Sequence, residues 1–403
     1  MTDTASIGAA GAAVDDGFGL DNLPFGVGRI DGGPSSILTR VGDRVVPVAD
    51  VVGDVVAPGV WASTTLNPFL SLGPDAWATV RSALRDRLAD PAALDALRPA
   101  GDAVMSLPVE IGDYVDFYSS IHHAENMGRI LRPGTDPLMP NWRHLPVGYH
   151  GRAGTVVVSG TPVRRPAGLV STDDGVHHRP TRQLDIELEV GFVIGVGNEP
   201  GNPVAVDEAD AHVFGVVLVN DWSARDIQAF EYRPLGPFLG KSFMTSMSAW
   251  VVPLEALRPA LVDPPMQEPP PHPGLRANRQ WGLDLELEAH LDGTTIARPS
   301  FAGTYWTFAQ QLAHLTSNGA TTRPGDLVAS GTVSGPGRGE RGSLMEATWN
   351  GAEPIRLDDG SERCWLADRD EVRLTGRATF DRGGREVTVT LGEVSGAVLP
   401  TGG

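Results

Sequence analysis

The sequence predicts a mainly β protein, in which a small barrel-like region near the N-terminus precedes a larger β-rich sandwich or roll. Short apolar runs bounded by Gly, Pro, Asn and Asp recur along most of the chain without a helical period. Helical spacing of apolar residues stands out at residues 74–97. Because a doubly wound α/β sheet alternates its strands with helices throughout, this pattern favours a β-rich architecture instead.

The first domain is expected at residues 19–110, after a flexible N-terminus at residues 1–18. Valine pairs at 45–46, 51–52 and 55–56 predict short β segments that Gly and Pro interrupt. Apolar residues three to six positions apart then predict one or two amphipathic helices that close this domain. These residues are Trp77, Val80, Leu84, Leu88 and Leu94.

The second domain, residues 111–403, is expected to contain most of the β structure. Six prolines between residues 262 and 280 predict an extended surface loop within it. Its strand-like runs are 155–159, 184–196, 213–219, 283–291, 326–329 and 386–391.

The composition narrows the function classes. In 403 residues, 50 acidic residues outnumber 32 basic ones, and the formal net charge of −18 disfavours nucleic acid and anionic lipid as partners. No apolar run approaches the roughly 20 residues that span a bilayer, and the first 17 residues lack a signal pattern, so we expect a cytoplasmic protein. The single cysteine, Cys364, excludes internal disulfides and multi-thiolate zinc sites. A metal would therefore bind through oxygen or imidazole.

Lysine occurs only once, at Lys241, and every other basic residue is arginine. A chain that uses arginine wherever charge alone matters has kept one compact ammonium. Chance and a local need for a small cation both explain this, and composition alone leaves both open. No His-Glu-x-x-His or Gly-x-Ser-x-Gly motif occurs, which weakens the zinc peptidase and serine hydrolase interpretations.

Acidic residues give the strongest local signal. Asp185, Glu187 and Glu189 alternate with apolar residues, so a strand would place three carboxylates on one face, roughly 6 to 7 Å apart. Such oxygen donors suit Ca²⁺ or Mg²⁺, although a solvated sheet face has the same pattern. Asp116 and Asp221 add two acids, and Asp221 directly follows an apolar strand-like run.

The same alternation returns at residues 283–288. This copy runs into Asp292-Gly293, a hairpin signal, and we interpret it as a structural, exposed, edge-type strand. Six of the ten histidines fall between His122 and His178. His122 and His123 would point to opposite sides of a strand, so at most one faces a given site, and spacing does not choose between them.

Several longer blocks closely resemble the fumarylacetoacetase (fumarylacetoacetate hydrolase) family, in family order from about Asn22 to the C-terminus. The resemblance implies an SH3-like N-terminal barrel, a mixed β-sandwich roll of the fumarylacetoacetase type as catalytic domain, and a homodimer. The blocks are DYVDFYSSIHHAENMG at 113–128, PNWRHLPVGYHGR at 140–152, LDIELE at 184–189, NDWSARDIQ at 220–228, PLGPFLGKSF at 234–243, SGTVSGP at 330–336 and GSLME at 342–346.

The resemblance also implies the roles of individual residues. Calcium ligands correspond to Asp116, Glu187, Glu189 and Asp221, and a magnesium-type site at or beside them corresponds to Asp221, Lys241 and Thr245. The catalytic histidine corresponds to His123, its acidic partner to Glu346, and the oxyanion-stabilising residues to Arg225, Gln228 and Lys241. Substrate contacts correspond to Tyr118, Arg132, Tyr149, Gln228, Tyr232 and Thr332. His122 stands where the family commonly has Gln, and the glycine-rich segment 335–342 departs from the family's more polar loop before Glu346.

The activity that the resemblance implies is hydrolysis of the carbon–carbon bond of the diketo acid 4-fumarylacetoacetate. The products are fumarate and acetoacetate, and this is the last step of tyrosine and phenylalanine catabolism. Two alternatives remain open: a metal-dependent decarboxylase, hydratase or isomerase of 2-oxo acids with the same fold, and a non-catalytic calcium-binding β module. The first group generally lacks this N-terminal domain and the His-Ala-x-Asn-x-Gly block. A binder would leave the ultraviolet absorbance of a conjugated diketone unchanged, whereas a hydrolase would abolish it.

Overall fold

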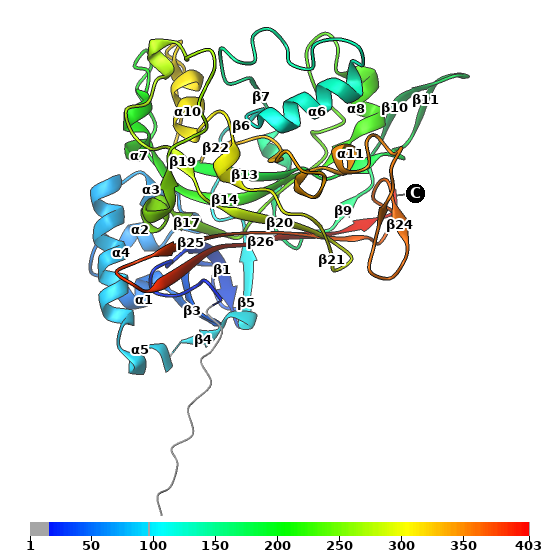
Figure 1. Cartoon of the computed structure of the whole chain (residues 1–403). Helices are drawn as coiled ribbons and strands as arrows, with labels where there is room; N and C mark the ends of the chain where they lie inside the picture. Colours follow the sequence, from blue (N-terminus) through cyan, green and yellow to red (C-terminus); the bar gives the residue numbers. More distant parts are fainter. Residues whose placement is uncertain (1–15, 96, 403) are drawn as a thin grey trace, which may run out of the picture.

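The computed structural model describes residues 16–95 and 97–402, and most of the predicted flexible start lies outside these ranges. Among the described residues a 13-stranded sheet runs from the N-terminal region into the C-terminal region, and a five-stranded sheet packs against its centre (Figure 1). The main path of the large sheet is β4 (Arg98–Pro99), β3 (Arg44–Pro47), β2 (Ser36–Val41), β1 (Phe25–Ile30), β17 (Trp250–Pro253), β14 (Val213–Asp221), β13 (Leu188–Ile194), β22 (Leu327–Ala329), β6 (Tyr114–Phe117) and β7 (Gly148–His150).

Three further strands join the large sheet beside that path, β5 (Ala103–Ser106), β8 (Val156–Val158) and β16 (Thr245–Met247). The five-stranded sheet is β21 (Thr294–Ala297), β20 (Glu286–Leu291), β25 (Glu371–Asp381), β26 (Glu386–Leu399) and β9 (Val163–Arg164). Short pairs are β10 (Ala167–Thr172) with β11 (Gly175–Pro180), β12 (Leu184–Asp185) with β15 (Ser223–Ala224), β18 (Leu261–Val262) with β19 (Gly282–Leu283), and β23 (Ile355–Arg356) with β24 (Glu362–Arg363).

The helices lie around these sheets, and none among the described residues has the length and apolar character needed to cross a membrane. In the N-terminal region they are α1 (Val48–Val52), α2 (Pro58–Trp61), α3 (Asn67–Leu70), α4 (Pro74–Leu88) and α5 (Pro91–Asp95). In the C-terminal region they are α6 (Ile121–Leu131), α7 (Ala209–His212), α8 (Arg225–Glu231), α9 (Leu254–Leu257), α10 (Phe308–Thr316) and α11 (Leu344–Ala347).

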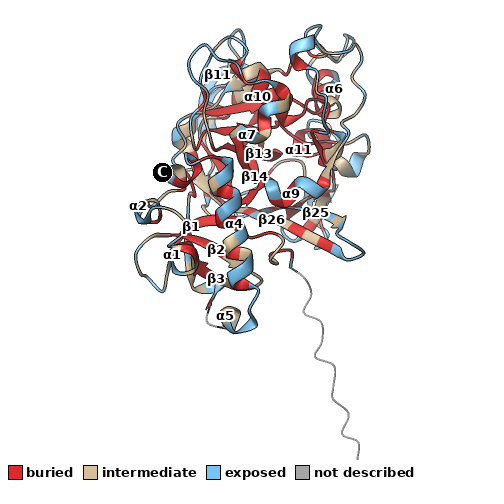
Figure 2. Ribbon diagram, turned by 90° about the vertical axis from the view of Figure 1, so that its left-hand side faces the viewer, coloured by how far each residue is buried: buried red, intermediate tan, exposed pale blue. Residues whose placement is uncertain are grey.

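Strand β14 forms the centre of the fold because both of its faces are buried (Figure 2). Val216 and Leu218 face the core that the two sheets enclose, whereas Val217 and Val219 face the core of the N-terminal region. This explains why the strand is an almost continuous apolar run, since alternation is expected only when one face meets water. The mainly β class is confirmed, with parallel pairs such as β22 with β6 among mostly antiparallel ones.

The N-terminal strands do not form a closed barrel among the described residues. Strand β1 pairs with β2 and β5 and also with β17, where Phe25 lies opposite Val251, so the N-terminal strands continue the sheet of the C-terminal region. The expected SH3-like barrel is therefore not confirmed.

Two local predictions in the N-terminal region are wrong. Val51 and Val52 lie in helix α1, and residues 55–56 lie in a turn, so neither pair forms a strand. Pro47 precedes the first turn of α1, and Val48 and Val52 are both buried one helical turn apart, which shows a helical period hidden within a β-branched run. The predicted helices α4 and α5 are confirmed.

Most predicted strands of the second domain are present, with two corrections. Residues 184–190 do not form one continuous strand, because β12 ends at Asp185 and β13 begins at Leu188. Strand β20 is not an edge strand, since it pairs with both β21 and β25, although its hairpin to β21 forms as predicted. The proline-rich segment 262–280 is largely irregular, with a single short 3₁₀ turn at Pro273–Leu275.

Candidate active site

Four buried carboxylates meet where the central strands end. Glu189 lies on β13, Asp221 closes the neighbouring β14, Asp116 lies on β6, and Glu187 occupies the gap between β12 and β13. Each offers an oxygen within 4.8 Å of an oxygen of every other. Two ligands on opposite sides of a Ca²⁺ ion, at about 2.4 Å each, lie about 4.8 Å apart. The spacing therefore fits a single shared cation.

The electrostatics of this cluster also fit a cation. Asp116 Oδ1 and both carboxylate oxygens of Glu189 are buried without a hydrogen-bond donor among the described residues. Burial and the neighbouring carboxylates raise the pKa of both groups well above the usual range. Unpartnered buried acceptors are rare because each loses its interaction with water. A bound divalent ion would supply the missing charge, so the donor set fits an oxygen-liganded metal.

Two basic side chains partly neutralise the same cluster. The Lys241 ammonium donates to Glu187 and, at 2.8 Å, to Asp221 Oδ2. Arg225 Nη2 lies 2.7 Å from Glu187 Oε1. Burial alone would raise the pKa of Glu187, but these two cations outweigh it and hold this pKa well below its usual range. Thr245 Oγ1 donates to Asp221 Oδ1 at 2.9 Å.

A histidine–carboxylate pair lies across from the acids. His123 is in helix α6, not on the strand we expected, and its Nδ1 lies 2.6 Å from Glu346 Oε2 in helix α11. Burial opposes the ionisation of Glu346, but His123 and hydrogen bonds from Asn126 and Ser343 hold the pKa of this carboxyl below its usual value. A charged Glu346 fixes the proton on Nδ1 and leaves the Nε2 lone pair free.

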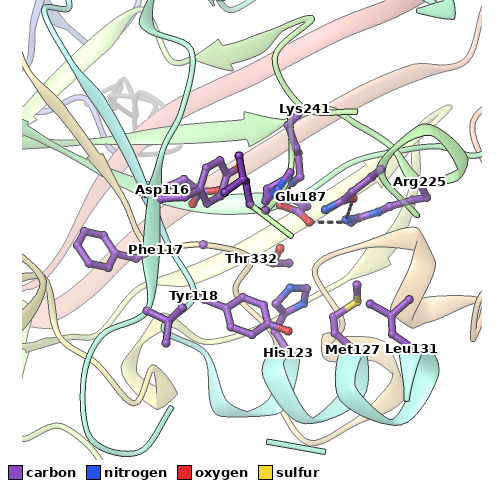
Figure 3. Close-up of a pocket in the computed structure, with 18 of the residues that line it drawn as sticks. Asp116, Phe117, Tyr118, His123, Met127, Leu131, Glu187, Arg225, Lys241 and Thr332 are labelled. Carbon is purple, nitrogen blue, oxygen red and sulfur yellow. Dashed lines mark hydrogen bonds and ion pairs between the residues drawn. The ribbon is translucent and has the colours of Figure 1, made fainter. Parts of the chain in front are cut away.

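One cavity of about 350 Å³ joins these groups (Figure 3). Of the four candidate metal ligands, Asp116 and Glu187 line the cavity, whereas Glu189 and Asp221 do not. Helix α6 contributes His123 from the opposite side. The other predicted residues that line the cavity are Tyr118, Arg132, Tyr149, Arg225, Gln228, Lys241 and Thr332.

Besides Glu189 and Asp221, three further predicted site residues lie outside the cavity wall. Glu346 is fully buried behind His123, and Thr245 contacts the cluster through Asp221. Tyr232 is half-buried at the C-terminal end of α8, where the Arg233 guanidinium lies 5.0 Å from its ring centroid. The structure thus brings most of the predicted residues together and leaves Tyr232 apart.

The structure also shows residues that sequence reasoning missed. Asn126 Nδ2 donates to Glu346 Oε1 at 3.0 Å, and the hydroxyls of Ser334 and Ser343 donate to Oε2 at 3.0 and 2.8 Å. For two of these residues, the spacing in the sequence could have indicated the contact. Asn126 is three residues after His123 on one helix, and Ser343 is three residues before Glu346, the spacing of a helix N-cap. Ser334 comes from a distant loop, and no local pattern indicated it.

Comparison with known proteins gives a consistent result. The family model "Fumarylacetoacetase N-terminal" matches residues 21–115, and "Fumarylacetoacetate (FAA) hydrolase C-terminal" matches residues 114–394. The fumarylacetoacetase of Homo sapiens is 45% identical over 96% of this chain and 97% of its own length. The fumarylacetoacetase of Caenorhabditis elegans is 43% identical over 95% of this chain and 96% of its own length. That of Arabidopsis thaliana is 40% identical over 96% of this chain and 97% of its own length.

Solved structures share the fold at lower identity. A fumarylacetoacetate hydrolase from Exiguobacterium antarcticum is 18% identical with a TM-score of 0.57, covering 94% of this chain and 99% of that one. Maleylpyruvate hydrolase from Sphingobium sp. SYK-6, solved with manganese(II) and pyruvate, is 15% identical with a TM-score of 0.52, covering 94% of this chain and 100% of that one. The fold, the cavity and these relatives define an enzyme of the hydrolase class. Within that class, the chain belongs to the fumarylacetoacetase family.

Proposed function

We propose that this enzyme hydrolyses the carbon–carbon bond of 4-fumarylacetoacetate, a diketo acid, to fumarate and acetoacetate, and so completes tyrosine and phenylalanine catabolism. The observation that carries the proposal is the cavity itself, which places a carboxylate cluster, an imidazole and two cations around one small space. Relatives named fumarylacetoacetase match about 96% of the chain, which supports the same substrate.

His123 acts as the general base in this proposal. Because its Nδ1 proton is held by Glu346, its Nε2 is free to take a proton from a water molecule in the cavity. The resulting hydroxide adds to the carbonyl next to the fumaryl group. Collapse of this adduct breaks the carbon–carbon bond and releases fumarate, and the proton held by His123 returns to the carbon of the departing acetoacetate. Glu346 stabilises the imidazolium that forms, and Asn126 and Ser343 keep that carboxylate in place.

The oxyanion that develops on the attacked carbonyl needs fixed donors. Arg225, Gln228 and Lys241 line the cavity. Figure 3 shows Arg225 and Lys241 on the side of Glu187. Arg225 Nη1 donates to Gln228 Oε1 at 3.2 Å, so the Gln228 amide keeps its NH₂ group as a donor. Each such fixed donor is worth on the order of 3 kcal/mol when removed. The single lysine fits here because a compact ammonium donates to two neighbouring carboxylates at once, whereas a planar guanidinium would present its donors in a different geometry.

Asp116, Glu187, Glu189 and Asp221 would hold Ca²⁺. When bound, such an ion would polarise the diketone oxygens and stabilise negative charge on the departing acetoacetate. The proposed Mg²⁺ position at or beside it would involve Asp221, Lys241 and Thr245. Burial lowers the pKa of Lys241, but the charges of Asp221 and Glu187 outweigh burial and raise this pKa above its usual value. Lys241 is therefore an ammonium without a lone pair. It contributes to the site as a hydrogen-bond donor to Asp221 and not as a metal ligand.

Substrate recognition is assigned to Arg132, Tyr118, Tyr149, Thr332 and, from outside the cavity wall, Tyr232. Arg132 is the strongest of these assignments. It lines the cavity, and its buried Nε has no acceptor among the described residues, although its Nη2 donates to the Pro137 carbonyl at 2.8 Å. A guanidinium that lines the cavity suits a substrate carboxylate, because its fork of N–H donors matches the two carboxylate oxygens.

We also propose that the chain works as a homodimer in the cytoplasm. Exposed apolar side chains near the cavity mouth support self-association: Leu235 is 97% exposed, and Phe238 and Leu239 follow it. Light scattering of the purified protein tests this, with twice the 42.6 kDa chain mass expected.

Turnover with product identification tests the proposed reaction. Purified enzyme should abolish the ultraviolet absorbance of many equivalents of fumarylacetoacetate, and NMR should show fumarate and acetoacetate in equal amounts. Carbon dioxide release or an isomerised product without cleavage would instead assign a decarboxylase or isomerase. Unchanged absorbance would assign a binding module.

A further inference from the structure

Asp185 is a buried carboxylate that belongs to neither the ligand cluster nor the histidine pair. It is fully buried. Its Oδ2 accepts from Arg225 Nε at 2.8 Å and from the Met345 amide at 3.1 Å. Its Oδ1 accepts from the Leu344 amide at 2.7 Å and from the adjacent Ile186 amide at 2.7 Å. Four N–H donors therefore converge on one side chain.

These donors come from the two parts of the proposed mechanism. Arg225 reaches past Asp185 to Glu187 and lines the cavity as a proposed oxyanion donor. Leu344 and Met345 begin helix α11, whose next residue, Glu346, holds His123. A single carboxylate thus connects the guanidinium on one side of the cavity to the base on the other.

The beginning of α11 depends on side chains for its hydrogen bonds. The first amide groups of a helix have no partner within the helix. Asp185 accepts from two of them, and Ser343 Oγ accepts from the third, the amide of Glu346, at 3.3 Å. A helix of four residues has little stability of its own, so these contacts determine where Glu346 lies.

We propose that Asp185 is a positioning residue, which fixes Arg225 and helix α11 relative to each other and so holds the oxyanion donor and the His123–Glu346 pair in register. It touches neither substrate nor water in this role. The inference rests on the proposed function, because it assigns Asp185 a part in the same reaction.

The chain contains a matched control. Residues 283–288 repeat the sequence pattern of 184–189, and Asp284 occupies the position that corresponds to Asp185. Asp284 is exposed, whereas Asp185 is buried. The same substitution at both positions therefore separates the buried bridge from the general effect of losing an aspartate.

Asp185→Asn is the sharp variant because it keeps the volume but turns one acceptor oxygen into an NH₂ group that faces other donors. With fumarylacetoacetate as substrate, we expect kcat to fall by roughly 10- to 100-fold and KM to change by less than about threefold, since a displacement of about 1 Å costs about that much. Calcium affinity should stay within about threefold. Asp284→Asn should match the wild type, and equal kcat values for the two variants would overturn the inference.

Double-mutant cycles separate positioning from general loss of structure. Asp185→Asn combined with Ser343→Ala, and separately with Arg225→Lys, should give kcat losses well below the product of the single losses, because each pair supports the same geometry. Independent losses in both cycles would contradict the inference. If Asp185→Asn does not fold, the cycle between Arg225→Lys and Ser343→Ala replaces it. Among the described residues no hydrogen bond joins Arg225 to Ser343. Arg225 donates to Asp185, and Asp185 and Ser343 accept from the first amides of the same helix, so independence there would also overturn the proposal.

A readout without turnover keeps the two proposals distinguishable. Hydrogen exchange followed by mass spectrometry should show faster exchange at residues 343–347 in Asp185→Asn, with unchanged exchange in strand β14. If the wild type does not cleave fumarylacetoacetate, the proposed function fails, and this experiment alone decides the inference. Unchanged exchange at 343–347 would then reject it.

Discussion

The ammonium of Lys241, the only lysine in the chain, lies 2.8 Å from Oδ2 of Asp221 and also donates to Glu187. One cation thus bridges two of the four carboxylates that would hold the metal. Its place at the cavity wall gives it a second proposed role as an oxyanion donor.

Lys241→Arg should therefore lose activity although it keeps the charge. We expect kcat to fall at least about tenfold, because a planar guanidinium cannot reproduce the point contacts of the ammonium with Glu187 and Asp221. Steady-state turnover of fumarylacetoacetate measures this. Wild-type rates in the variant would show that the position needs only a positive charge.

Glu187→Gln should weaken metal binding and activity together. Glu187 has a carboxylate oxygen within reach of each of the other three acids, and its charge is held by Lys241 and Arg225. We expect calcium affinity, measured by titration calorimetry, to fall by at least about 10- to 100-fold. Glu286→Gln is the matched control, because Glu286 occupies the same place in the repeated pattern but pairs with Arg377 at the surface. Normal affinity and a normal rate in Glu187→Gln would remove Glu187 from the site.

His123→Ala and His122→Ala should differ strongly. Both residues lie on helix α6, but His123 is buried against Glu346 whereas His122 is only partly buried. Loss of the proposed base should lower kcat by about 100- to 10,000-fold with calcium affinity unchanged, and loss of His122 should cost less than about threefold. The comparison uses kcat and calcium titration on both variants. The reverse ranking would transfer the base to His122.

The stabilisation by calcium should increase with pH. In the cation-free protein, burial and neighbouring carboxylates raise the pKa of Asp116 and Glu189 above their ordinary 3.8 and 4.5. The folded state then binds more protons than the unfolded chain above those values, so these two groups lower stability as pH rises. A bound cation offsets this loss of stability, because it stabilises the ionised carboxylates.

Thermal unfolding from about pH 5 to about pH 8, with calcium and with chelator, measures this. The gain in Tm on adding calcium should grow by several degrees across that range. A gain that does not increase with pH would show that these carboxylates are already ionised without the metal.

Local sequence patterns predicted a substantial part of the fold. The buried run at β14, the helices α4 and α5, and the hairpin after β20 all follow from periodicity and turn residues. Helix α1 was missed because its β-branched residues favour strands when Pro47 is not recognised as a helix start. The pairing of β1 with β17 joins residues more than two hundred positions apart, which no local pattern encodes.

In the site, too, local patterns predicted some features, and contacts between distant segments determined the others. Alternation at residues 184–190 identified three acids, yet only Glu187 and Glu189 join the cluster, while Asp185 pairs with Arg225. A solvated sheet face would have the same pattern, and burial decides between the two. Asp116 reaches the cluster through the parallel pairing of β6 with β22, a contact between distant segments that periodicity cannot supply.

Calcium titration coupled to turnover tests the central claim most directly. The enzyme is stripped with chelator, assayed with fumarylacetoacetate, and then titrated with Ca²⁺ while the rate and the bound metal are both followed. We expect negligible turnover in the stripped enzyme and full recovery at about one ion per chain, with no recovery in His123→Ala despite normal calcium binding. Full activity in the metal-free enzyme, confirmed by elemental analysis, would contradict this claim.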